Sequence, residues 1–178
     1  MLQCTRFKSL RNTKPESTVS VLSILQEIST DKYKSQIEEI RNFENPSKNP
    51  LKDKLPVFTP TGIFNHRSMA GLENYNGLMC LDIDHIENPE QLKEQCKKLN
   101  YVFSAFVTPS GKGLKVLIKT NATPENYKLV EEEIASAFAH DAGGIRDNRC
   151  KDIARIQFVS YDPDLYYNPD STIFNVNK

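Results

Sequence analysis

The sequence predicts an α+β fold with a β-α-β-β-α-β core between residues 77 and 160. Apolar, β-branched runs of strand length alternate there with segments whose apolar residues recur at helical spacing. Glycines and prolines separate these segments and act as turn signals. The order is typical of the split β-α-β arrangement found in RRM-like and ferredoxin-like domains.

Each core element has its own signal. Strands are expected at Gly77–Asp84, Tyr101–Val107, Leu114–Lys119 and Ile153–Ser160, and helices at 89–99 and 123–139. Pro89 suits the first position of a helix, and Gly143 with Gly144 suits the end of one. In this topology the first strand lies between the third and the fourth, antiparallel to both. Alternation along the strands then puts polar residues of all three on one face.

Residues 1–54 are predicted to form a helical extension that leads into the core at 55–178, the whole being one compact unit. A short strand is expected at Leu2–Phe7, and helices at Ser17–Ile28 and Asp31–Phe43. A polar, proline-rich connector follows, and residues 55–64 have the pattern of a short hairpin. A last edge strand is expected at 172–176.

The composition excludes several classes of protein. Lys+Arg and Asp+Glu both number 23 in 178 residues, which excludes a uniformly basic, histone-like nucleic-acid binder. No apolar run suits a membrane span or a signal peptide, so no membrane partner is expected. The cysteines have no CxxC spacing and predict reduced, structural thiols in a cytoplasmic protein rather than a zinc site: Cys4, Cys80, Cys96 and Cys150.

Two aspartates at the end of the first core strand form the first candidate site. Asp82 and Asp84 share one face of the strand, about 7 Å apart at a rise of ~3.3 Å per residue. Carboxylates at this distance repel each other unless a cation lies between them, and Mg²⁺ or Mn²⁺ suits such ligands. A solvated strand end is the alternative, because Asp-x-Asp is a common tripeptide.

The turn after the second core strand is the second candidate. Ser110, Gly111, Lys112 and Gly113 can hold a phosphate with backbone N–H groups and the lysine, and Lys115 adds a charge facing the aspartates. A plain hairpin turn explains the same residues, since Ser-Gly-Lys-Gly is good turn material.

A charged segment before the fourth core strand is the third candidate. Asp147 is a possible third carboxylate, and Arg155 is expected to point toward the same face and contact a carboxylate or a phosphate. A solvated loop is the alternative, and a salt bridge from Asp152 to Arg155 would explain part of it. Arg67 is a weaker phosphate-contact candidate. The predicted topology brings the three candidates to one place.

The segments LDID, TPSGKGLKVLI and DNRCKDIARIQFVSYDPDLY together resemble the archaeo-eukaryotic primase superfamily. More narrowly, they are similar to the VirE-type amino-terminal primase domain of replication proteins from mobile elements, over about residues 55 to 170. The resemblance implies polymerisation of nucleoside triphosphates on a single-stranded DNA template with Mg²⁺ or Mn²⁺. It assigns the metal to Asp82, Asp84 and Asp147, with Asp152 also possible in the third role. It assigns the nucleotide to Ser110, Gly111, Lys112, Gly113, Lys115 and Arg155.

One position departs from that superfamily, which usually has histidine where this chain has Lys115. Lysine still neutralises a triphosphate but lacks a titrating imidazole. A catalytically degenerate module that binds nucleotide or single-stranded DNA is therefore the main alternative. A third possibility is an interaction domain whose charges form an internal salt-bridge cluster. Because such domains are commonly fused to a helicase, a helicase domain or protein is an expected partner.

Overall fold

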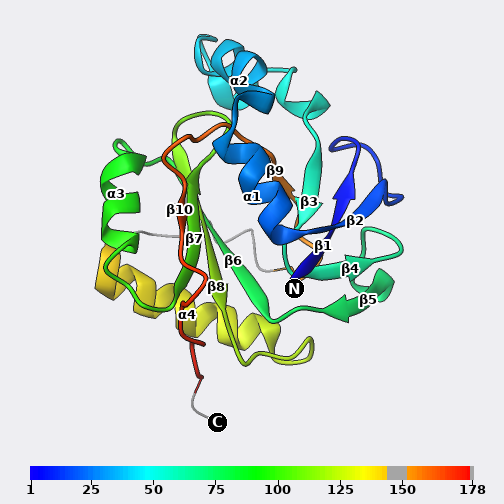
Figure 1. Cartoon of the computed structure of the whole chain (residues 1–178), viewed down its shortest axis with the longest axis vertical. Coiled ribbons are helices and arrows are strands. Elements are labelled where there is room, and N and C mark those ends of the chain that lie inside the picture. The colour runs from blue at the N-terminus through cyan, green and yellow to red at the C-terminus, as the bar shows by residue number, and fades with distance from the viewer. Residues whose placement is uncertain (144–151, 177–178) are drawn as a thin grey trace.

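The computed structural model describes residues 1–143 and 152–176. In them it shows a mixed α/β protein with antiparallel sheets and the helices α1 to α4 (Figure 1). The α+β class predicted from the sequence is therefore confirmed. Among the described helices, none is both long enough and apolar enough to cross a membrane.

The central sheet has the spatial order β10-β7-β8-β6 and contains three of the four predicted core strands, β6, β7 and β8. Its strands are β6 (Leu78–Asp84), β7 (Val102–Val107), β8 (Gly113–Lys119) and β10 (Tyr166–Tyr167). β6 and β8 are antiparallel, with Asp82 opposite Lys115 and Asp84 opposite Gly113. The predicted pairing of the first and third core strands is thus confirmed, whereas β10 had no sequence prediction.

Both faces of the central sheet are buried. Helices α3 (Pro89–Cys96) and α4 (Tyr127–Ala142) cover one face, over Leu81, Ile83 and Val116. The other face, with Phe106 and Leu117, packs against α1 and its neighbours from the amino-terminal region. The predicted alternation is correct for these strands, but the polar face is open only near the ends that carry Asp82 and Lys115.

The amino-terminal region forms a second sheet, in the order β2-β1-β3-β9. Its strands are β1 (Gln3–Phe7), β2 (Ser17–Ser20), β3 (Val57–Thr59) and β9 (Gln157–Phe158). β1 lies where a strand was predicted. Residues 17–20 are a strand rather than the first helical turn, and Ser20 instead caps α1 (Val21–Ser29) by accepting a hydrogen bond from the Ser23 N–H. The next predicted helix begins as a 3₁₀ turn and continues as α2 (Lys34–Arg41).

The predicted fourth core strand is wrong in both length and partner. Of Ile153–Ser160 only β9 is a strand, and it pairs with β3 rather than with β6. The Val159 N–H also donates to the Pro56 carbonyl, and the Thr61 hydroxyl donates to the Ile153 carbonyl at 2.6 Å. This segment is therefore held by hydrogen bonds to residues 56–61 instead of pairing with β6. Within the described strands β6 lies at a sheet edge, and a complete ferredoxin-like sheet is not confirmed.

Two smaller predictions also differ from the structure. β4 (Gly62–Phe64) pairs with β5 (Leu72–Tyr75), not with β3, so residues 55–64 do not form a hairpin. The edge strand expected at 172–176 is reduced to one bridge between Phe174 and Thr120. The predicted glycine ends α4, because Gly143 adopts the left-handed conformation with φ +77°, although the helix spans Tyr127–Ala142 rather than 123–139. Burial raises the pKa of the Cys4 and Cys96 thiols to about 12, in keeping with structural roles.

Candidate functional site

A cavity of about 490 Å³ lies where the central sheet meets residues 152–158 and the amino-terminal region. Three carboxylates and four cations contribute to its wall: Asp82, Asp84, Asp152, Lys52, Arg67, Lys115 and Arg155. Five of these seven were expected at one place from the sequence, and Arg67 was a weaker candidate. Such a mixture of signs suits a ligand that is itself anionic and carries a metal ion.

Asp82 and Lys115 form the inner wall of this cavity. They face each other across the β6–β8 ladder, and the Lys115 ammonium makes an ion pair with the Asp82 carboxylate. The two residues are only 6% and 7% exposed, whereas Asp84 is exposed at the end of β6. This direct pair is the contact that the salt-bridge interpretation predicted, but it borders a cavity rather than closed packing.

Asp152 and Arg155 enter the cavity wall from the segment before β9. The Asp152 carboxylate accepts a hydrogen bond from the Ala154 N–H at 2.9 Å, and the Arg155 N–H donates to the Asp152 carbonyl. Asp152 therefore caps a turn, and no ion pair joins it to the Arg155 side chain. The exposed Arg155 guanidinium stays available to a ligand in the cavity.

The turn between β7 and β8 lies beside the cavity rather than in its wall. Thr108 and Pro109 contribute to the lining, but the four residues that follow them do not: Ser110, Gly111, Lys112 and Gly113. Ser110 is buried, and its hydroxyl shares a hydrogen bond with the Thr108 hydroxyl. The predicted phosphate cradle is thus next to the charged cavity, while Lys112 is exposed outside it.

The glycines of this turn have structural causes. Gly111 has φ +70°, a conformation that other residues rarely adopt. A Cβ on Gly113 would lie 2.7 Å from the Ile83 carbonyl oxygen across the ladder, which is too close. The Arg41 guanidinium on α2 also contacts the start of this turn: it donates to the Thr108 carbonyl at 3.3 Å and to the Tyr161 carbonyl at 2.9 Å. The hairpin-turn explanation therefore accounts for both glycines.

Lys52 is a cavity residue that the sequence did not reveal. It belongs to the proline-rich connector, in the short 3₁₀ turn Lys52–Lys54. Its ammonium lies 5.2 Å from the centre of the Phe158 ring. Burial, and then the nearby charge of Lys115, lower the pKa of Lys52. No local pattern marks this lysine, because its position depends on pairing between β3 and β9.

Asp147, the residue expected to be the third carboxylate, lies outside the described residues. Among the residues that are described, no group of three potential metal ligands is assembled. Asp82 and Asp84 are therefore the carboxylates that the described part of the cavity offers to a metal ion, with Asp152 also in the wall.

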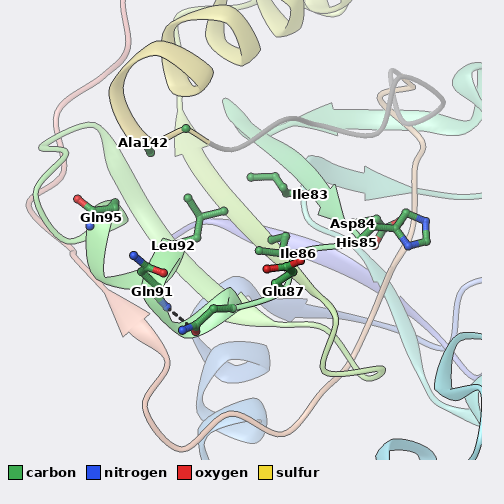
Figure 2. A pocket seen from close by; sticks show the side chains of 11 residues that line it. Ile83, Asp84, His85, Ile86, Glu87, Gln91, Leu92, Gln95 and Ala142 are labelled. Atoms are coloured by element: carbon green, nitrogen blue, oxygen red, sulfur yellow. Dashed lines mark hydrogen bonds between the residues drawn. The ribbon is translucent and has the colours of Figure 1, made fainter.

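A larger cavity of about 610 Å³ lies on the other side of Asp84, between residues 83–88, α3 and the end of α4. Figure 2 shows Ile83, Ile86 and Leu92 within it, and the side chains of Gln91 and Gln95 on its α3 side. Its charged lining consists of Asp84, Glu87 and no described lysine or arginine. We therefore place the candidate site in the smaller cavity, where carboxylates and cations converge.

One comparison with known proteins gives a family. A family model described as "BT4734-like, N-terminal domain" matches residues 50–167. The chain therefore belongs to the BT4734-like N-terminal domain family. Comparisons with curated proteins and with solved structures gave no match.

Proposed function

We propose that this chain is a metal-dependent nucleotidyltransferase of the primase or primase-polymerase type. It would polymerise nucleoside triphosphates on a single-stranded DNA template during replication of a mobile element. The observation that carries the proposal is the cavity in which Asp82 and Asp84 are joined by four cations from separate parts of the chain. The resemblance to VirE-type primase domains supplies the reaction class, the mobile-element setting, the helicase partner and the primase-like core.

The carboxylates fit Mg²⁺ or Mn²⁺ in a specific way. Mg²⁺ sites that handle phosphates commonly use one or two carboxylates together with phosphate oxygens and water. Asp82 and Asp84 supply two carboxylates, and Asp147 is the proposed third. When bound, such ions supply Lewis-acid stabilisation of phosphoryl charge and lower the pKa of an attacking hydroxyl.

The cations fit a triphosphate. Lys52, Lys115 and Arg155 line the same cavity as the aspartates, so a phosphate chain there is within reach of both signs of charge. A triphosphate carrying a metal ion would offer Lys115 a phosphate in place of Asp82, and would offer Asp82 a divalent cation in place of the ammonium. We therefore treat the Asp82–Lys115 pair as exchangeable rather than permanent.

A second candidate function is a catalytically degenerate module that binds nucleotide or single-stranded DNA. The ion pair between Lys115 and Asp82 favours it, because a metal ion must compete with an ammonium for that carboxylate. The lysine also stands where the resembling superfamily has histidine. In this case binding survives but polymerisation does not.

Primer synthesis on single-stranded DNA with Mn²⁺ tests both candidates. The variant combines Asp82→Asn with Asp84→Asn, and the matched control combines Asp164→Asn with Asp170→Asn, both exposed and outside the cavity. Product from wild type and control, but not from the site variant, supports the enzyme. Mn²⁺-dependent triphosphate binding without product, lost in the site variant, supports the degenerate module. A protein that shows no product, no metal-dependent triphosphate binding and no binding of single-stranded DNA contradicts both candidates and supports the salt-bridge interpretation.

A further inference from the structure

The loop between β1 and β2 is a basic surface beside the candidate site. We define the basic hairpin loop as residues 8–14; its charged members are Lys8, Arg11 and Lys14, all exposed. The first acidic residue of the chain is Glu16, so residues 1–15 carry only basic charged side chains in a protein of zero net charge.

The basic hairpin loop is held in place by hydrogen bonds. Within it, the Asn12 N–H donates to the Ser9 carbonyl at 3.1 Å, and the Ser9 hydroxyl donates to the Asn12 side chain at 2.8 Å. At its base the Glu16 N–H donates to the Arg6 carbonyl at 2.8 Å. Its lysines and arginine therefore project from a defined backbone.

Arg67 joins the basic hairpin loop to the cavity. The Arg67 N–H donates to the Thr13 carbonyl at 3.0 Å, and its guanidinium donates to the Leu10 carbonyl. Leu10 and Arg67 themselves line the cavity that contains Asp82 and Asp84. Through Leu10 the loop thus contributes to the lining of the cavity; Figure 1 shows the loop as the dark-blue turn that connects β1 to β2.

The three basic side chains of this loop differ from surface lysines such as Lys32 and Lys97, which have acidic partners. Lys32 and Lys97 form ion pairs with Glu27 and Glu94 at 2.7 and 2.5 Å. Across the described residues, no carboxylate lies within ion-pair distance of the three basic side chains of the loop. An external polyanion can therefore bind them without first displacing an internal partner.

We propose that the basic hairpin loop binds the sugar–phosphate backbone of single-stranded DNA at the rim of the cavity. The assignment of that strand as a template rests on the proposed function. The binding itself does not, because exposed lysine and arginine neutralise phosphates whether or not chemistry follows. The loop gives a neutral chain a local basic surface for a polyanion, next to the cavity that Leu10 helps to line.

The test compares two triple variants that remove equal charge. One combines Lys8→Gln, Arg11→Gln and Lys14→Gln; the control combines Lys97→Gln, Lys98→Gln and Lys128→Gln, exposed positions near or on α3 and α4. Binding of a fluorescent oligothymidine is measured without metal or nucleotide, over a range of salt. The loop variant is expected to bind about tenfold more weakly in low salt, and its salt slope to fall by about 2. The control is expected to stay within about twofold of wild type, with both variants folded by circular dichroism.

Some results would overturn this inference. The first is that the wild-type protein does not bind oligothymidine, and the second is that both variants lose the same amount of affinity for it. The third is loop-dependent binding to vesicles of anionic lipid that is tighter than binding to DNA. Failure of the proposed function gives a different result. Loop-dependent DNA binding in a protein that shows neither primer synthesis nor metal-dependent triphosphate binding supports the surface and contradicts the enzyme. Full polymerisation by the loop variant, with unchanged affinity for DNA, supports the enzyme and contradicts the DNA-binding surface.

Discussion

Two buried Lys–Asp pairs in this protein have different surroundings. Lys93 and Asp162 join α3 to the segment after β9, and they are 1% and 3% exposed. Lys115 and Asp82 join β8 to β6, and they are 7% and 6% exposed. Burial alone does not separate these pairs, so their remaining contacts decide what each one does.

Both members of the Lys93–Asp162 pair make further contacts within the protein. Lys93 donates to both Asp162 oxygens at 2.8 Å and also contacts Glu90 at 2.7 Å. Asp162 in addition accepts the Val107 N–H at 2.8 Å. The pair contributes to neither of the two cavities, and it fixes the end of β7 just before the turn at 108–113.

The Lys115–Asp82 pair instead forms a wall of the charged cavity, together with Asp84, Lys52 and Arg155. Replacement partners of either sign can reach it from the cavity. Backbone hydrogen bonds fix the Lys93–Asp162 pair in the fold, whereas we expect the Lys115–Asp82 pair, which borders other charges in a cavity, to exchange partners with a ligand.

The largest expected effect concerns the structural pair. Asp162→Ala leaves Lys93 buried with only Glu90 as a partner, and we expect it to lower the free energy of unfolding by about 3–5 kcal/mol. Urea denaturation measures this. Lys97→Met, which removes an exposed i,i+3 pair, is the control and is expected to cost less than about 1 kcal/mol. Equal costs for the two variants would show that Asp162 is not structural.

Asp82→Asn is expected to affect nucleotide binding more than it affects stability, in contrast to Asp162→Ala. It removes a proposed metal ligand but preserves shape, so Mn²⁺-dependent nucleotide affinity is expected to fall at least about tenfold. Stability is expected to change by less than for Asp162→Ala, because water and other charges in the cavity can solvate Lys115. Isothermal titration calorimetry and urea denaturation give the two numbers. Unchanged nucleotide affinity would rule out Asp82 as a ligand.

Lys115→Met separates the two roles proposed for the Lys115–Asp82 pair, competition with the metal ion and contact with a phosphate. Without the ammonium, Mn²⁺ alone is expected to bind Asp82 and Asp84 a few-fold more tightly, because its competitor is gone. The Mn²⁺–triphosphate complex is expected to bind about tenfold more weakly, because a phosphate contact is lost. Electron paramagnetic resonance measures the free Mn²⁺ in each titration. Changes of the same sign for metal alone and for the complex would contradict the exchange.

The smallest expected effect is on how the affinity for Mg²⁺–ATP depends on pH, which we attribute to Lys52. Because the pKa of Lys52 is lowered, its ammonium is present at low pH and is lost earlier than that of an exposed lysine as the pH rises. Affinity for Mg²⁺–ATP is therefore expected to fall by about threefold toward alkaline pH, and Lys52→Arg to flatten this fall, since arginine stays protonated. Lys54→Arg, an exposed neighbour, is the control. Identical profiles for the two variants would remove Lys52 from the site.

The sequence predicted what depends on local pattern. The alternation in β6 and β8 gave the facing of Asp82 and Lys115, and the glycine at 143 gave the end of α4. Position 155 was placed at the same cavity, although the strand that was to carry it lies elsewhere.

Long-range pairing was not predictable in the same way. β3 is only three residues long, and nothing in Val57–Thr59 indicates that it pairs with β9, which was predicted to pair with β6. The role of Lys52 follows from that pairing, so it was missed as well. The Lys93–Asp162 pair joins residues 69 positions apart, and Lys93 has the sequence features of an ordinary surface lysine.

A crystal structure with Mn²⁺ and a non-hydrolysable nucleoside triphosphate would show directly whether Lys115 and Asp82 exchange partners when a ligand binds. We expect Mn²⁺ to be bound by Asp82 and Asp84 at about 2.1 Å, with the Lys115 ammonium moved from Asp82 to a phosphate oxygen and the Lys93–Asp162 pair unchanged. An intact Lys115–Asp82 pair, with metal and nucleotide bound elsewhere or not at all, would contradict it.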